Sequence, residues 1–106
     1  MIDSRILLLL ASSALAIAPA HAADVAAGKA KAEEVCVDCH GDDGKGDDES
    51  PDIVKITEKE FITAMQEFQN GKRNDPEKMA QKMVREAKKL SAADIANLAA
   101  YYQTLK

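Results

Sequence analysis

Apolar side chains recur three or four residues apart in four stretches of the chain, and this spacing predicts four amphipathic helices. The first is expected over about residues 25–35, with Asp24 as its N-cap. The second is expected over about residues 58–69, because Thr57 and Glu60 have the spacing of a capping box. Their apolar positions are Val25, Gly28, Ala32 and Val35 in the first helix and Phe61, Met65 and Phe68 in the second.

The third and fourth helices are indicated by their start signals. Asp75 and Pro76 suit the N-cap and the first position of the third helix, and Ser91 and Asp94 have the spacing of a capping box for the fourth. The apolar positions are Met79, Ala80, Met83, Val84, Ala87 and Leu90 in the third helix and Ile95, Leu98, Ala99, Tyr102 and Leu105 in the fourth. On periodicity alone, the methionines of the second and third helices are core residues.

Gly28 stands in the middle of the first predicted helix, where it costs about 1 kcal/mol relative to alanine. Because it falls on the apolar face, it favours close approach by another helix. A tolerated glycine in a short helix is the alternative.

An acidic loop, residues 41–52, separates the first two helices and contains three glycines and six carboxylates. Such a stretch predicts a solvated loop, and the residue spacing of a calcium-binding loop is absent from it. Basic residues gather instead on the third helix, at Lys78, Lys82, Arg85, Lys88 and Lys89. The two regions would give the molecule an electrical dipole that steers a partner. Two solvated faces without a partner are the alternative.

The first 22 residues have the pattern of a secretory signal peptide. Arg5 precedes an apolar run at residues 6–17, and Ala20-His21-Ala22 forms an A-x-A cleavage site. The run is too short for a transmembrane helix, so we expect cleavage and no stable membrane insertion, with an uncleaved anchor as the alternative. In a bacterium, export places the mature domain, residues 23–106, in the periplasm.

Charge and size restrict the functions open to this domain. Removing 22 of the 106 residues leaves 84, and the net charge stays at −4 because Asp3 and Arg5 leave together. An acidic domain without a basic patch is a poor candidate for nucleic-acid binding. A domain this small buries little surface and usually needs a covalent or cofactor staple.

The motif Cys36-Val37-Asp38-Cys39-His40 has the form C-x-x-C-H, the attachment signature of c-type haem. Two thiols three residues apart can form thioethers with the two vinyl groups of a porphyrin, and the histidine can then bind iron. Without the signal peptide, His40 is the last histidine and no further cysteine remains. Bis-histidine ligation within the chain and a second haem are therefore excluded.

Three other interpretations of the cysteine pair remain open. A thioredoxin-like redox pair would need a βαβ setting, a structural zinc site would need four ligands, and a plain disulfide would leave His40 without a role.

Pro51 is a further candidate site residue in this region. Its carbonyl could accept a hydrogen bond from Nδ1 of His40 and fix the imidazole, as partners of metal-binding histidines commonly do. A proline that merely ends the acidic run is the alternative.

The mature chain resembles the class I c-type cytochromes, in particular small bacterial monohaem proteins of the c553/c4-like kind. The stretches that carry the resemblance are 36–41, Pro51, 68–73 and 90–102. The resemblance implies an all-α fold of about four short helices around one covalently bound haem, with the first and last helices crossing near Gly28 and Tyr101. It also implies a methionine iron ligand seven residues before Leu90, which is Met83, with Met79 as the runner-up.

The function implied is a periplasmic one-electron carrier with His/Met ligation and no enzymatic activity. With both axial positions filled by His40 and Met83, no site is left for a substrate, and thioether sulfur raises the potential of the iron. We expect a monomer that docks transiently on redox partners. One alternative is a haem subunit of a periplasmic dehydrogenase of the flavocytochrome type. A five-coordinate haem protein that binds gas or acts as a peroxidase is another.

Overall fold

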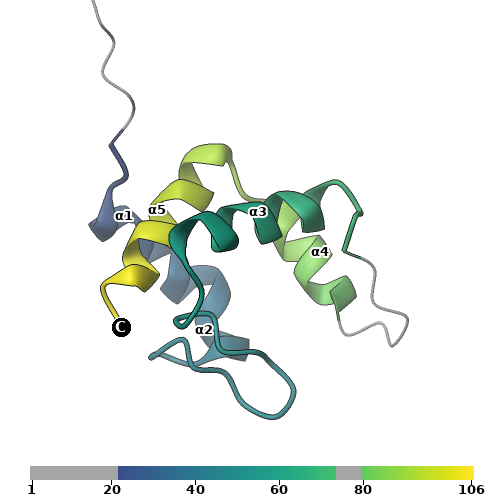
Figure 1. The fold of residues 1–106 in the computed structure, drawn as a ribbon, viewed down its shortest axis with the longest axis horizontal. Coiled ribbons are helices and arrows are strands. Elements are labelled where there is room, and N and C mark those ends of the chain that lie inside the picture. Colours follow the sequence, from purple (N-terminus) through teal and green to yellow (C-terminus); the bar gives the residue numbers. More distant parts are fainter. Residues whose placement is uncertain (1–21, 74–79) are drawn as a thin grey trace, which may run out of the picture.

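The computed structural model describes residues 22–73 and 80–106, and within these ranges the chain forms four helical segments and no strand (Figure 1). The fold class is therefore the predicted all-α one. The predicted signal peptide lies outside the described residues. No helix in the described part is long and apolar enough to cross a membrane.

The first helical segment is longer than the sequence pattern predicts. It consists of α1 (Val25–Lys31), a π-helical turn η2 (Ala32–Cys36) and α2 (Val37–His40), joined end to end. The predicted end near Val35 was wrong, because the helix ends only at Gly41, whose φ of 82° is readily adopted by glycine. Val25 is 42% exposed rather than buried, so the apolar face of α1 begins at Gly28.

The second helix, α3 (Glu58–Gln69), has the predicted bounds. Both bonds of the capping box are present: the backbone N–H of Glu60 donates to Oγ1 of Thr57 at 3.0 Å, and that of Thr57 donates to Oε1 of Glu60 at 3.3 Å. These bonds satisfy two backbone donors that a helix start leaves free.

The last two helices are α4 (Ala80–Lys88) and α5 (Ala92–Gln103). The expected start of α4 at Asp75 and Pro76 lies outside the described residues. In α5 the capping box is confirmed, with the Asp94 N–H donating to Oγ of Ser91 at 2.9 Å and the Ser91 N–H donating to the Asp94 carboxylate at 3.0 Å.

The core forms where α1 crosses α5, which is the most extensive helix contact in the described chain, while α3 packs on both α4 and α5 (Figure 1). Gly28 is buried at the crossing, where a Cβ atom would collide with the backbone carbonyl of Asn97 and come within 2.9 Å of Cβ of Tyr101. The predicted close approach is thus confirmed. The buried apolar residues are Ala32, Val54, Phe61, Met65, Ala87, Leu90, Ile95, Leu98, Ala99 and Tyr102.

Replacing Gly28 with valine is expected to separate α1 from α5, because the new side chain meets backbone rather than a flexible side chain. We expect the free energy of unfolding to fall by about 3 kcal/mol, at the upper end of overpacking costs. Denaturant titration of the holoprotein measures this. Ala26→Val, at an exposed position of the same helix, is the control. Equal stability of the two variants would contradict the crossing.

Candidate functional site

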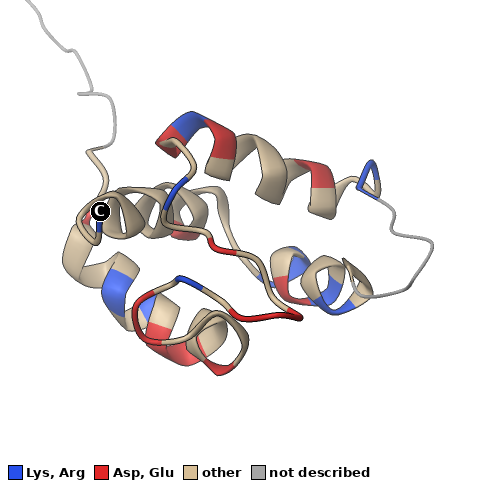
Figure 2. Cartoon of the chain, turned by 60° about the horizontal axis from the view of Figure 1, so that its bottom comes forward, with Lys and Arg blue, Asp and Glu red and all other residues tan. Residues whose placement is uncertain are grey.

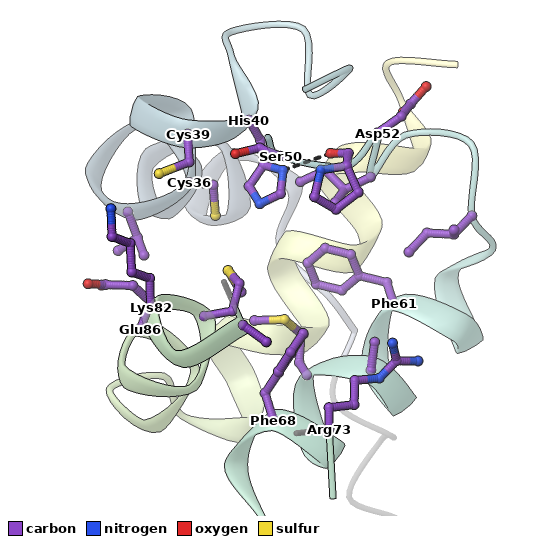
Figure 3. A pocket seen from close by; sticks show the side chains of 18 of the residues that line it. Cys36, Cys39, His40, Ser50, Asp52, Phe61, Phe68, Arg73, Lys82 and Glu86 are labelled. Atoms are coloured by element: carbon purple, nitrogen blue, oxygen red, sulfur yellow. Dashed lines mark hydrogen bonds between the residues drawn. The ribbon is translucent and has the colours of Figure 1, made fainter. Parts of the chain in front are cut away.

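A cavity of about 630 Å³ opens between α2, α3 and α4, and its wall is mostly apolar (Figure 3). That volume lies within the ~300–1,000 Å³ typical of ligand and cofactor pockets. Its lining residues are Val35, Cys36, Cys39, His40, Glu49, Ser50, Pro51, Asp52, Ile53, Ile56, Glu60, Phe61, Ala64, Met65, Phe68, Arg73, Ala80, Lys82, Met83, Glu86 and Leu90.

The three residues of the C-x-x-C-H motif line one wall of this cavity together (Figure 3). His40 is only 5% exposed, Cys36 is half-buried and Cys39 is exposed, so Cys39 marks the side on which the cavity meets solvent. Both cysteines are free thiols. Burial raises the pKa of the Cys36 thiol, the nearby Tyr102 hydroxyl lowers it, and the Glu86 carboxylate raises it.

The imidazole of His40 is fixed by a hydrogen bond to the backbone of the acidic loop. Its Nδ1 lies 2.9 Å from the carbonyl oxygen of Pro51, which is the contact that the sequence analysis proposed (Figure 3). With Nδ1 as the donor, Nε2 carries the free lone pair that a metal would need.

The acidic loop is exposed to solvent, as predicted, and hydrogen bonds within it fold its backbone against His40 and Pro51. The Gly46 N–H donates to the carbonyl of His40 at 2.8 Å, and the Gly46 backbone, with φ of 70°, approaches Pro51 so closely that a Cβ atom would collide with it. The Asp47 carboxylate accepts bonds from the N–H groups of Glu49 and Ser50 at 2.8 and 2.9 Å, and these bonds lower the pKa of the Asp47 carboxyl. The loop thereby fixes the position of the Pro51 carbonyl, although its acidic side chains remain largely exposed.

A methionine stands on a different wall of the same cavity. Met83 comes from α4 and is half-buried against the core cluster. Met65 also lines the cavity, but it is 5% exposed and belongs to the core, as its helical spacing predicted. Met79, the runner-up, lies outside the described residues.

Gln69 is a residue whose role the sequence pattern did not indicate. Its side-chain amide, at the end of α3, donates to the backbone carbonyls of Ala87 at 2.8 Å and of Leu90 at 2.9 Å. These carbonyls belong to the end of α4 and the turn after it, where few backbone donors are available; the Ala87 carbonyl also accepts from the Leu90 N–H at 3.1 Å. Gln69 thus ties the helix that carries Met83 to α3. The only sequence signal was its place in the stretch 68–73.

Two cations also line the cavity, Arg73 and Lys82. The Arg73 guanidinium lies 5.6 Å from the centre of the Phe68 ring and donates from Nε to the Glu67 carboxylate at 2.8 Å. In Figure 3 the side chains of Arg73 and Phe68 come from the opposite side of the cavity to Cys36 and Cys39. The Arg73 guanidinium therefore places positive charge on the side away from the thiols, whereas the Lys82 side chain lies on the same side as Cys39.

The competing interpretations of the cysteine pair find little support in the described residues. Nowhere in 22–73 and 80–106 do three histidine, cysteine or acidic side chains gather as a metal ion bound by protein alone would require. A thioredoxin-like setting needs strands, and that part of the chain has none. The donor set fits an iron porphyrin instead: two thiols beside one buried imidazole, an apolar wall and a thioether across the cavity.

Comparison with known proteins gives the same indication. A family model described as cytochrome c matches residues 25–106. Cytochrome c-554(547) of Halothiobacillus neapolitanus is 33% identical over 91 residues, and the match covers 80% of this chain and 100% of that protein.

Replacing Gln69 with alanine is expected to lower the free energy of unfolding by about 1–3 kcal/mol, because two carbonyls lose a shared donor. Thermal unfolding followed by circular dichroism measures this. Gln66→Ala, at an exposed position of the same helix, should change the midpoint far less. A Gln69 variant as stable as the Gln66 variant would show that the amide does not hold α4.

Proposed function

The chain belongs to the cytochrome c family, and on that premise we propose that it is an exported periplasmic one-electron carrier with His40 and Met83 as its axial iron ligands. Membership of the family makes it an electron-transfer protein with covalently bound haem c. The observation that carries the finer proposal is that Cys36, Cys39 and His40 line one apolar cavity together with Met83.

Each residue of the site has a separate task in this proposal. Cys36 and Cys39 would hold the haem through thioether bonds, and His40 and Met83 would be the two iron ligands. When bound, the haem supplies an iron that takes up or releases a single electron. The Pro51 carbonyl holds His40 in one tautomer and orientation, with Nε2 left to bind the iron. Arg73 offers a charge partner for a carboxylate of the haem.

Filled axial positions argue for a carrier rather than an enzyme. With His40 and Met83 both engaged, the iron would offer no open position to a substrate. Cys39 is exposed, so the edge of the haem that it anchors would stand near the surface, where a partner could receive the electron.

Charge supports transient docking by a monomer. Figure 2 shows acidic residues along the loop that follows α2 and basic residues on α4. The exposed members are Asp42, Asp43, Asp47, Asp48 and Glu49 in the loop and Lys82, Arg85, Lys88 and Lys89 on or after α4. Separated charges of opposite sign orient an approaching redox partner and speed encounter at low salt.

Met83→Ala tests the ligand assignment and, with it, the carrier function. We expect the ferric holoprotein to lose the near-red sulfur-to-iron absorption band and its reduction potential to fall, because thioether sulfur favours ferrous iron. Optical spectra and redox titration measure both, and Met79→Ala should change neither. Loss of the band in the Met79 variant would overturn the assignment. Rapid binding of carbon monoxide to the reduced wild-type protein would overturn six-coordination and favour a five-coordinate haem protein.

Export and haem attachment can be tested in one measurement. Expressed in a bacterium with a cytochrome c assembly system, the periplasmic protein should have the intact mass of residues 23–106 plus one haem that acid–acetone does not extract. A mass that includes residues 1–22 would instead indicate an uncleaved anchor. A stable stoichiometric complex with a dehydrogenase on gel filtration would favour the role of a bound subunit.

A further inference from the structure

The hydroxyl group of Tyr102 stands out because it is buried without a hydrogen-bond partner among the described residues. Tyr102 is 1% exposed and belongs to α5. Its ring packs against the rings of Phe61 and Tyr101, with centroids 5.8 and 5.2 Å apart. Packing alone would be served as well by phenylalanine, and burying an unbonded hydroxyl costs about 1–3 kcal/mol.

The polar neighbour of this hydroxyl is the Cys36 sulfur. Cys36 packs against the core cluster that contains Tyr102. The two groups influence each other: the hydroxyl lowers the pKa of the Cys36 thiol, and the thiol adds to the effect of burial in raising the pKa of Tyr102. The observations that place the two groups in one packed region are the contact of Cys36 with the core cluster and the burial of the Tyr102 hydroxyl without a partner in the described chain.

We propose that in the mature holoprotein the Tyr102 hydroxyl donates a hydrogen bond to the thioether sulfur of Cys36, which makes Tyr102 a positioning residue for haem attachment. This inference rests on the proposed function, because it needs the thioether. Attachment adds the Cys36 S–H bond across a vinyl C=C bond: sulfur bonds to one vinyl carbon, the hydrogen passes to the other, and no net oxidation occurs.

Formation of the thioether determines which of the two groups donates the hydrogen bond. A free thiol and a hydroxyl can each donate or accept, so the pair has two arrangements. Once sulfur carries two carbons it can only accept, and the hydroxyl, which has no other partner in the described part of the chain, must be the donor. The bond would satisfy the hydroxyl and hold the Cys36 sulfur on the cavity side of α5.

Proton NMR of the ferrous, diamagnetic wild-type holoprotein tests the bond directly. We expect a slowly exchanging hydroxyl proton from Tyr102 with a nuclear Overhauser effect to the β-protons of Cys36. Its assignment is checked by its absence from Tyr102→Phe and its persistence in Tyr101→Phe, a half-buried neighbour on the same helix. A Tyr102 hydroxyl proton that exchanges rapidly with water, or that shows no effect to Cys36, would overturn the inference.

Stability supplies an independent readout. Tyr102→Phe should reduce the folding equilibrium constant of the holoprotein about fivefold, the size of a typical hydrogen bond, while Tyr101→Phe leaves it within twofold. An unchanged or larger constant in Tyr102→Phe would overturn the inference, since removal of an unbonded buried hydroxyl is neutral or stabilising. If Tyr102→Phe yields no holoprotein, the NMR spectrum of the wild-type protein still decides.

The failure of this inference can be distinguished from the failure of the proposed function. A wild-type protein that retains covalent haem but lacks the contact between Tyr102 and Cys36 refutes this inference alone, whereas a colourless wild-type protein refutes the proposed function.

Discussion

The structure depends on an apolar cavity that the helices surround but do not fill. Within the described chain, α1 packs on α5, and α3 packs on α4 and α5, whereas α2 makes its main helix contacts with the turn that precedes it. The segments that carry His40 and Met83 both line the cavity and make little contact with each other. A domain this small buries little surface of its own, so the haem that the family binds would supply much of its cohesion. The same group that carries the electron thus also completes the core.

Local signals predicted most of the fold because each was sufficient by itself. The capping boxes at Thr57 and Ser91 set the starts of α3 and α5, and Gly28 indicated the helix crossing. The continuation of the first helix beyond Val35 was missed, because a π-helical turn has no strong sequence signature. The role of Gln69 was missed for a different reason. Its two acceptors are backbone carbonyls 18 and 21 residues away, and the identity of a side chain carries no information about such distant partners.

The residues of the candidate site, too, were only partly predictable from local sequence signals. The motif at 36–40 identified Cys36, Cys39 and His40 because their spacing is itself the chemistry of attachment. Helical periodicity could not separate a methionine that binds metal from one that fills a core, since both must face inward. Met65 and Met83 do line the same cavity, and their difference lies in burial and in the wall from which each comes. The three-dimensional placement of the two residues supports the proposal that Met83, and not Met65, is the iron ligand.

The wide turn at Ala32–Cys36 also alters the rotational phase of the chain. Cys39 follows Gly28 by eleven residues, a spacing that corresponds to three turns of an α-helix, so an unbroken helix would point Cys39 at α5 as Gly28 does. Because a π-helical turn takes more residues for each revolution, every residue after it is rotated about the helix axis away from the face that carries Gly28. This rotation lets one continuous helix present a glycine to a neighbouring helix and, eleven residues later, a thiol to the mouth of the cavity. The extra residue in the π-helical turn thereby allows one continuous helical segment both to pack on α5 and to carry the haem-attachment cysteine, without a break in the helix.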